Sequence, residues 1–233
     1  MSLASFPPGW RALVIGASGA IGAAFVARLA ADPGCAAVLG LHRQSSPPID
    51  FHRDGSVAAA AAAVADQGPF QLIIHAAGVL HGPRMQPEKK LADLDEAQLL
   101  DIFRVNAIGP ALVLRHFAPL LDARRGVLAV LSAKVGSIGD NRLGGWYGYR
   151  ASKAALNMLV KTAAIEVKRS KPQAVLVALH PGTVSSRLSQ PFRGAEIGRP
   201  ADLAAGEMLA VIDRLTPDDS GQFIAYDGQR LPW

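Results

Sequence analysis

Short apolar runs alternate with longer segments of helical periodicity along this chain, and this alternation constrains the fold more than any other feature. Such an order is typical of strand–helix units that build a parallel sheet. The chain should therefore fold as a doubly wound α/β protein, with ligands at the carboxyl ends of the strands. Buried strands are predicted at residues 12–16, 36–42, 49–51, 70–78, 126–132, 174–182 and 222–226.

Helices are expected between these strands. Ser56 is the predicted N-cap of a helix that ends before Gly68, because serine and glycine are common at these two ends. Pro110 should bend or divide a long helical segment, since proline has no backbone N–H to donate. The other predicted helical segments and this long one cover about 20–31, 95–122, Tyr149 to before Pro172, and about 200–214.

Composition excludes several classes of protein. Half of the 233 residues are apolar, enough for one substantial core, so residues 1–233 are expected to form a single domain. The net charge of +5 is scattered, which favours a solvated surface over a nucleic-acid site. Cys35 is the only cysteine, and we find no signal segment, membrane span or metal-ligand spacing among the histidines. We expect a cytoplasmic protein with neither a metal nor a membrane or nucleic-acid partner.

A glycine-rich turn follows the first predicted strand. In "VIGASGAIG", Gly16, Gly19 and Gly22 lead from the strand into the first helix. Glycines let the backbone approach a pyrophosphate, whose charge then faces the free amides of the helix N-terminus. The alternative is a tight strand-to-helix connection that binds nothing.

The end of the second strand bears on the choice of cofactor. A carboxylate there would bind a ribose diol, whereas a base would bind a 2′-phosphate. His42 and Arg43 stand there with no acid, which favours NADP over NAD unless Arg43 is only a solvated loop residue. Asp50 and Phe51, after the next predicted strand, could lie beside the adenine.

Two tyrosines precede one lysine in "WYGYRASK". Tyr149 and Lys153 are four residues apart and share a helix face, whereas Tyr147 lies six residues from Lys153 and points elsewhere. A neighbouring ammonium, together with a cationic nicotinamide, would lower the pKa of the Tyr149 phenol and make it a useful general acid or base. The alternative is an ordinary amphipathic helix in which the two residues meet by chance.

Together these segments resemble the short-chain dehydrogenase/reductase superfamily. The resemblance rests on "GASGAIG", "HAAG", "VNAIGP", "YRASK" and "HPGTVSS", in this order, and covers nearly the entire chain. The segments "GSIGDNRLGGWYGYRASKAALN" and "YDGQRLPW" are similar to its C-factor and sniffer-like carbonyl reductase branch. The resemblance implies a seven-stranded Rossmann sheet. It also implies hydride transfer between NADP(H) and a small carbonyl or alcohol substrate, with NAD as the other possible cofactor.

The same resemblance implies a role for each matching residue. Asn106 would hold a water in a proton relay, Tyr149 would be the acid/base, and Lys153 would bind the nicotinamide ribose and lower the tyrosine pKa. The remaining expected cofactor contacts are Gly16, Ser18, Gly19, Ala20, Ile21, Gly22, His42, Arg43, Asp50, Phe51, Ala76, Ala77 and Gly78, followed by the nicotinamide loop with Pro181, Gly182, Thr183, Val184 and Ser186.

Three positions depart from the family pattern. Ala20 replaces the middle glycine of the turn, and "HAAG" lacks the asparagines often found there. The third departure is Ala133, which stands where the family has its substrate-orienting serine. Ser137 is the preferred replacement and Ser132 the second, because a strand residue one step away faces the opposite side. Alternatively, both hydroxyls only bond the backbone in a turn.

The departure at Ala133 and the C-factor resemblance keep a second function open. The chain could be a signalling or regulatory protein that binds NAD(P) with little turnover. An apolar substrate cleft could be lined by Met85, Leu143, Trp146 and Phe192. The long helices 95–122 and 149–170 are the expected contact surfaces of a homodimer or homotetramer.

Overall fold

One parallel sheet carries the fold in the computed structural model, which describes residues 2–83, 85–192 and 194–233. Its strands lie in the order β2-β1-β3-β4-β5-β6, and every neighbouring pair is parallel. The order reverses beside β1, so the first crevice for a ligand opens between the ends of β1 and β3. The strands are β1 (Trp10–Ile15), β2 (Cys35–Leu41), β3 (Leu72–His75), β4 (Val127–Leu131), β5 (Val175–His180) and β6 (Phe223–Ala225).

The expected seventh strand is wrong: the described chain forms six strands, and residues 49–51 are a loop that enters a turn at Phe51. Ile49 is buried, which explains the apolar pattern. Its amide donates to the His42 carbonyl at 3.1 Å, and the Asp50 amide donates to the Ser56 hydroxyl at 2.9 Å. Ser56 is accordingly the first residue of the following helix rather than its N-cap, which is Gly55.

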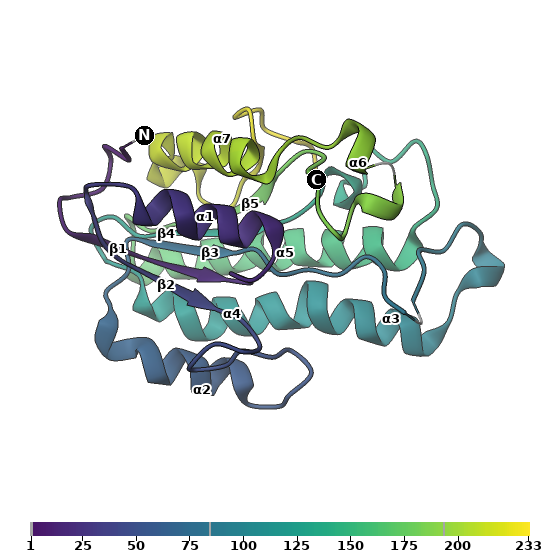
Figure 1. Ribbon diagram of the computed structural model, residues 1–233, viewed down its shortest axis with the longest axis horizontal. Coiled ribbons are helices and arrows are strands. Elements are labelled where there is room, and N and C mark those ends of the chain that lie inside the picture. Colours follow the sequence, from purple (N-terminus) through teal and green to yellow (C-terminus); the bar gives the residue numbers. More distant parts are fainter. Residues whose placement is uncertain (1, 84, 193) are drawn as a thin grey trace.

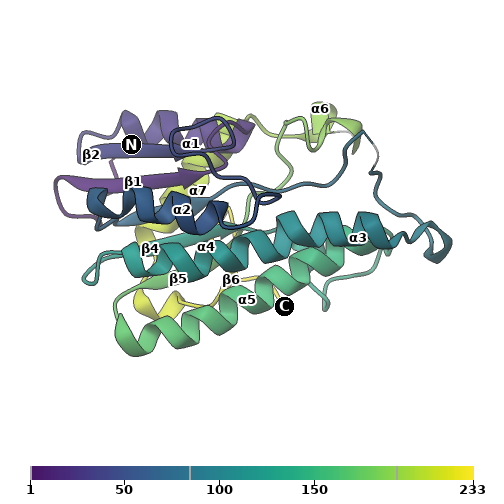
Figure 2. The same cartoon turned by 90° about the horizontal axis from the view of Figure 1, so that it is seen from below.

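Helices cover both faces of the sheet. Figure 1 shows α1 and α7 above it and α2 and α4 below it; Figure 2, seen from below, shows α2, α3, α4 and α5 on this lower face. Alternate strand residues divide between two cores: Val14 packs toward α1 and α7, and Ile15 toward α2, α4 and α5. The helices are α1 (Ala20–Ala30), α2 (Ser56–Val64), α3 (Glu96–Phe103), α4 (Gly109–Phe117), α5 (Tyr147–Ser170), α6 (Gly194–Ile197) and α7 (Ala201–Arg214). Short 3₁₀ turns cover Ala65–Gln67, Leu91–Asp93, Ala118–Leu120, Lys134–Gly136, Gln190–Phe192 and Pro217–Asp219.

The long helix predicted over 95–122 is divided. A π-helical turn, Arg104–Ile108, separates α3 from α4, and Pro110 is the second residue of α4. Proline removes one helical donor, and the wider turn accommodates the break. The stretch Glu96–Leu120 also has the length and hydropathy of a membrane span, but α4 packs Val113 and Phe117 into the core beneath the sheet.

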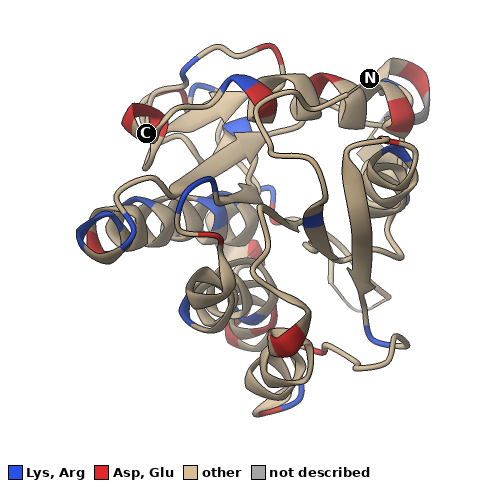
Figure 3. Cartoon of the chain, turned by 90° about the vertical axis from the view of Figure 1, so that its left-hand side faces the viewer, with Lys and Arg blue, Asp and Glu red and all other residues tan. Residues whose placement is uncertain are grey.

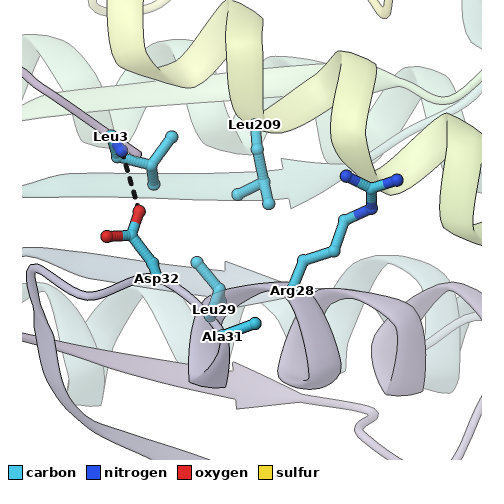
Figure 4. A pocket seen from close by; sticks show the side chains of 6 residues that line it. All are labelled: Leu3, Arg28, Leu29, Ala31, Asp32 and Leu209. Atoms are coloured by element: carbon cyan, nitrogen blue, oxygen red, sulfur yellow. Dashed lines mark hydrogen bonds between the residues drawn. The ribbon is translucent and has the colours of Figure 1, made fainter. Parts of the chain in front are cut away.

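The N-terminal segment is fixed near the amino ends of the strands, opposite their carboxyl ends. The Leu3 amide donates to Asp32 at 2.8 Å, and Arg28 on α1 pairs with Asp202 on α7 at 2.7 Å. A small cavity lies beside this joint (Figure 4), lined by Leu3, Arg28, Leu29, Ala31, Asp32 and Leu209. Because its charged groups already have partners, the cavity belongs to the packing of α1 against α7. Figure 3 shows basic and acidic residues intermixed over the surrounding helices and loops.

Candidate functional site

The loops after β1, β3, β4 and β5 meet at the carboxyl edge of the sheet and hold the sequence-predicted site residues. In the glycine turn after β1, two glycines lie in close contact with other backbone atoms and the third has free space beside it. A Cβ on Gly16, whose φ is +86°, would lie 2.7 Å from the Ala77 nitrogen, and one on Gly22 would lie 2.1 Å from the Gly16 oxygen. At Gly19 the nearest atom would be 3.4 Å away. Gly16 and Gly22 therefore let backbone pack on backbone.

The first turn of α1 is open to a ligand. Ser18, Gly19 and Ala20 are exposed, and Ile21 is partly buried. The turn carries no acidic residue, and no side chain caps it. Its free N–H groups and the positive end of the helix suit an anion. The glycine spacing thus leaves room for a pyrophosphate despite Ala20.

Arg43 extends the site beyond β2. It is exposed and forms no hydrogen bond or ion pair within the described chain. The His42 ring instead accepts from the Gln44 amide at 3.1 Å and belongs to the turn. Asp50 accepts from the His52 amide at 3.0 Å, and the Phe51 ring packs on His75 with 5.6 Å between ring centroids. A free guanidinium is therefore available at this end of the crevice.

The segment after β3 passes close to the catalytic candidates. The Ala76 amide donates to the Ile15 carbonyl at 2.7 Å. A Cβ on Gly78 would lie 3.4 Å from Asn106 Oδ1 and 3.6 Å from Lys153 Nζ. His75, which precedes this segment, is fully buried, and neither ring nitrogen has a partner in the described chain. Burial lowers the pKa of His75 to about 3, so its ring is neutral.

Asn106 locks this segment to the helices. It is fully buried in the π-helical turn. Its Oδ1 accepts from the Val79 amide at 2.8 Å, and its Nδ2 donates to the Val79 carbonyl at 2.7 Å and to the Ser152 hydroxyl at 3.2 Å. Both polar atoms of the side chain are thus used to fix the strand-to-loop junction against α5.

Tyr149 and Lys153 lie on one buried face of α5. The Lys153 ammonium lies 5.9 Å from the Tyr149 ring centroid and donates to the Leu131 carbonyl at 3.0 Å. Burial raises the pKa of Tyr149 to about 12 and lowers that of Lys153 to about 8. In the protein alone, burial therefore keeps the phenol protonated, the opposite of the lowering expected with a cationic nicotinamide. Tyr147 is the first residue of α5 and is half-buried.

Neither the Ser132 nor the Ser137 hydroxyl forms a hydrogen bond with Tyr149 in the described chain. The Ser132 hydroxyl donates to Asn157 Oδ1 at 2.6 Å, and the Ser137 hydroxyl accepts from the Asp140 amide at 3.1 Å. Both serines are buried. Ala133, in contrast, packs against the apolar cluster that contains Tyr149. The methyl group stands where the sequence pattern led us to look for a hydroxyl.

An apolar and aromatic wall stands over Tyr149. The Trp146 ring meets Tyr149 edge-on at 6.2 Å and Phe192 at 5.0 Å between centroids. Leu143 lies outside this wall, since it is 92% exposed. The cluster around Tyr149 comprises Val79, Leu80, Met85, Ile102, Phe103, Ala133, Val135, Trp146, Leu188 and Phe192. The sequence interpretation did not name six of these residues, because nothing in their local pattern separates them from ordinary core residues: Val79, Leu80, Ile102, Phe103, Val135 and Leu188.

The loop after β5 is braced by Arg199, another residue that the sequence interpretation missed. Its guanidinium lies 3.6 Å from the Tyr226 ring centroid, pairs with Glu207 and donates to the Pro181 carbonyl at 2.6 Å. Gly182 has φ of +71°, and a Cβ there would lie 2.8 Å from Arg199 Nη2. The loop of Pro181, Gly182, Thr183, Val184 and Ser186 is thereby held at the carboxyl end of β5.

Sequence comparison identifies relatives of the chain. The sequence model of the family described as short chain dehydrogenase matches residues 48–196. The C-signal of Myxococcus xanthus is 37% identical over 170 residues, covering 71% of this chain and 94% of that protein. The 1-hydroxy-2-glutathionyl-2-methyl-3-butene dehydrogenase of Rhodococcus sp. (strain AD45) is 34% identical over 194 residues, covering 80% and 79%.

Solved structures share the fold. An NADPH-bound carbonyl reductase from chicken fatty liver superposes with a TM-score of 0.82 at 24% identity, covering 98% of this chain and 96% of that one. The carbonyl reductase Sniffer of D. melanogaster gives 0.81 at 23% identity, covering 97% and 100%. At these identities the likeness concerns the fold.

Proposed function

The chain belongs to the short chain dehydrogenase family, and on this premise we propose that it transfers a hydride between NADP(H) and a small carbonyl or alcohol, with Tyr149 as the general acid/base. The observation that carries the proposal is the buried pair on α5, where the Lys153 ammonium lies 5.9 Å from the Tyr149 ring beneath an apolar wall. A structural Tyr–Lys contact would not require a location at the carboxyl edge of the sheet, where ligands of this fold bind.

The residues at the crevice fit a dinucleotide. The first-turn amides of α1 at Ala20 and Ile21 would hold the pyrophosphate, since the Gly19 amide already donates to the Gly16 carbonyl at 3.0 Å. Arg43, free of partners in the described chain, would bind a 2′-phosphate, which favours NADP over NAD. Lys153 would bind the nicotinamide ribose, and the loop from Pro181 to Ser186 would hold the carboxamide. When bound, the nicotinamide supplies or accepts the hydride.

The proton chemistry belongs to the chain itself. With a pKa of about 12, the Tyr149 phenol is protonated at neutral pH and can donate to the oxygen of a carbonyl. The Lys153 ammonium favours the phenolate that remains, because opposite charges stabilise each other in a buried site. Asn106 would hold the water through which the proton is replaced with the second lone pair of its Oδ1, since its other side-chain hydrogen-bonding positions are taken. No neighbouring serine hydroxyl is needed if the apolar wall alone positions the substrate.

Turnover of NADPH tests this function. Purified wild-type protein should consume NADPH with apolar aldehydes, ketones or diketones, and NADH more slowly. Arg43→Ala should reduce the preference for NADPH over NADH by about tenfold, since one charge-assisted contact is lost. NADH used as well as NADPH by the wild type would refute the cofactor assignment, and no turnover of either cofactor would refute the reductase.

Ala133 favours a second function. Without a substrate-orienting hydroxyl the chain could be a regulatory protein that binds the cofactor and turns over little, and the relative at 37% identity is a C-signal. Binding of NADPH, measured by calorimetry, without consumption on any tested carbonyl would support this alternative.

A further inference from the structure

A buried carboxylate lies at the start of the helix that carries Tyr149. Glu88 comes from the loop between β3 and α3 and is only 2% exposed. Its Oε2 accepts from the Gly148 amide at 3.1 Å, and its Oε1 accepts from Gln98 Nε2 at 2.9 Å. No Lys, Arg or His in the described chain forms an ion pair with it. The carboxylate is therefore balanced by N–H donors, one of them on α5.

Helix α5 lacks a cap of its own. Its first turn contains no acidic residue, and the N-cap residue, Trp146, makes no side-chain capping bond. Trp146 has φ of 53° and is the only non-glycine residue with positive φ in the described chain. An uncapped helix start leaves free N–H groups and a partial positive charge, which an anion stabilises. Glu88 supplies this anion from 60 residues away.

The residues that contact Glu88 leave space for its side chain. A Cβ on Gly148 would lie 2.9 Å from Glu88 Oε1 and 3.1 Å from Leu99, so glycine keeps this position open. The Glu88 carbonyl accepts from the Trp146 amide at 2.5 Å, which holds the left-handed residue in place. One residue thus fixes both Trp146 and Gly148, two residues that closely precede Tyr149.

We propose that Glu88 is a positioning residue for the reaction: it caps α5 from outside the helix and thereby fixes Tyr149 and the Trp146 wall. The inference rests on the proposed function, since it assigns Glu88 a role in aiming the Tyr149 phenol. Small displacements of an acid/base group reduce the rate strongly, even when the group remains present.

The capping itself is tested without any reaction. In Glu88→Ala, hydrogen exchange of the Gly148 amide, followed by NMR, should accelerate at least tenfold, because its acceptor is lost. Asp93→Asn is the matched control: Asp93 lies in the same loop but accepts only from the Lys89 and Lys90 amides, at 3.0 and 3.2 Å. An unchanged exchange rate at Gly148 in Glu88→Ala would overturn the proposal.

Positioning is tested by steady-state kinetics of the complete protein. Glu88→Gln keeps the size of the side chain but turns an NH₂ group toward one of two N–H donors, so it should displace the start of α5. We expect kcat to fall at least tenfold and the solvent deuterium isotope effect to rise, while NADPH Kd and carbonyl KM stay within about threefold. Asp93→Asn should match the wild type.

The outcomes separate the two proposals. A folded Glu88→Gln with wild-type kcat and isotope effect would overturn the positioning role while the reductase stands. If the wild type turns over no substrate, the reductase fails; the exchange rate of Gly148 then still decides whether Glu88 caps α5.

Discussion

At the scale of single residues, one buried and one partly buried histidine are held neutral. His75 is fully buried without a partner in the described chain, and burial lowers its pKa to about 3. His180 accepts from the Lys134 amide at 3.2 Å, and burial lowers its pKa to about 4. Both pKa values start from 6.5 in the unfolded chain. As the pH falls below 6.5, the unfolded chain takes up these protons first, so the folded state loses stability.

His75→Asn should therefore flatten the acid side of the stability profile. Each such histidine reduces the free energy of unfolding by up to about 1.4 kcal/mol per pH unit between pH 6.5 and its folded pKa. Urea unfolding at pH 7, 6, 5 and 4 measures this slope. His116→Asn, on α4, is the control and should keep the wild-type slope. Equal slopes in His75→Asn and the wild type would show that His75 is not held neutral.

Ala133 and its neighbours give a second prediction at this scale. The Ser132 and Ser137 hydroxyls bond Asn157 and the Asp140 amide, so Ser132→Ala and Ser137→Ala should each keep kcat within about threefold. Ala133→Ser should raise kcat, because it places a hydroxyl in the cluster around Tyr149. Steady-state kinetics of the three variants decides. A loss above tenfold in one serine variant would identify that serine as the substrate-orienting residue.

At the scale of the elements, much of the fold could be predicted because the strands are buried on both faces and read as apolar runs. Residues 49–51 misled the prediction, because burial of Ile49 gives them the apolar pattern of a strand. The Ile49 amide nevertheless donates to the His42 carbonyl and not to a neighbouring strand. Glu88 and Arg199 were missed for another reason: their partners, Gly148 and Pro181, lie far along the chain. Helical spacing selected Tyr149 over Tyr147 because that relation is local.

Two substitutions in the glycine turn after β1 separate the effect on backbone packing from the effect on cofactor binding. Gly22→Ala would bring a Cβ to 2.1 Å from the Gly16 oxygen, so it should lower the free energy of unfolding by about 3 kcal/mol. Gly19→Ala meets its nearest atom only at 3.4 Å and should unfold close to the wild-type denaturant concentration, but bind NADPH more weakly. Urea denaturation and calorimetric titration measure the two effects. If Gly22→Ala unfolds like Gly19→Ala, the close backbone packing is not needed.

At the scale of the whole molecule, α4 and α5 present an apolar surface. Exposed large side chains include Ile108, Leu112, Met158 and Ile165. A groove runs between the two helices, lined by residues that include Leu114, Arg115, Leu159 and Ala163. We propose that this surface forms the contact of a homodimer or homotetramer, because monomers rarely expose large apolar patches.

Light scattering tests this assembly. The wild type should be a dimer or tetramer at micromolar concentration, and Met158→Glu should shift it to monomers by placing a charge in the apolar contact. Leu143→Glu, at an exposed leucine in the loop after β4, should leave the mass unchanged. A wild-type monomer at micromolar concentration would refute the proposed contact.

The most direct test of the proposed acid/base chemistry compares two tyrosines of one helix. NADPH consumption with the best carbonyl substrate is measured for wild type, Tyr149→Phe and Tyr147→Phe. We predict that Tyr149→Phe loses on the order of 100-fold or more in kcat, because the general acid is removed. Tyr147→Phe should keep kcat near the wild type. A Tyr149→Phe variant with near-normal turnover would show that this phenol does not transfer the proton.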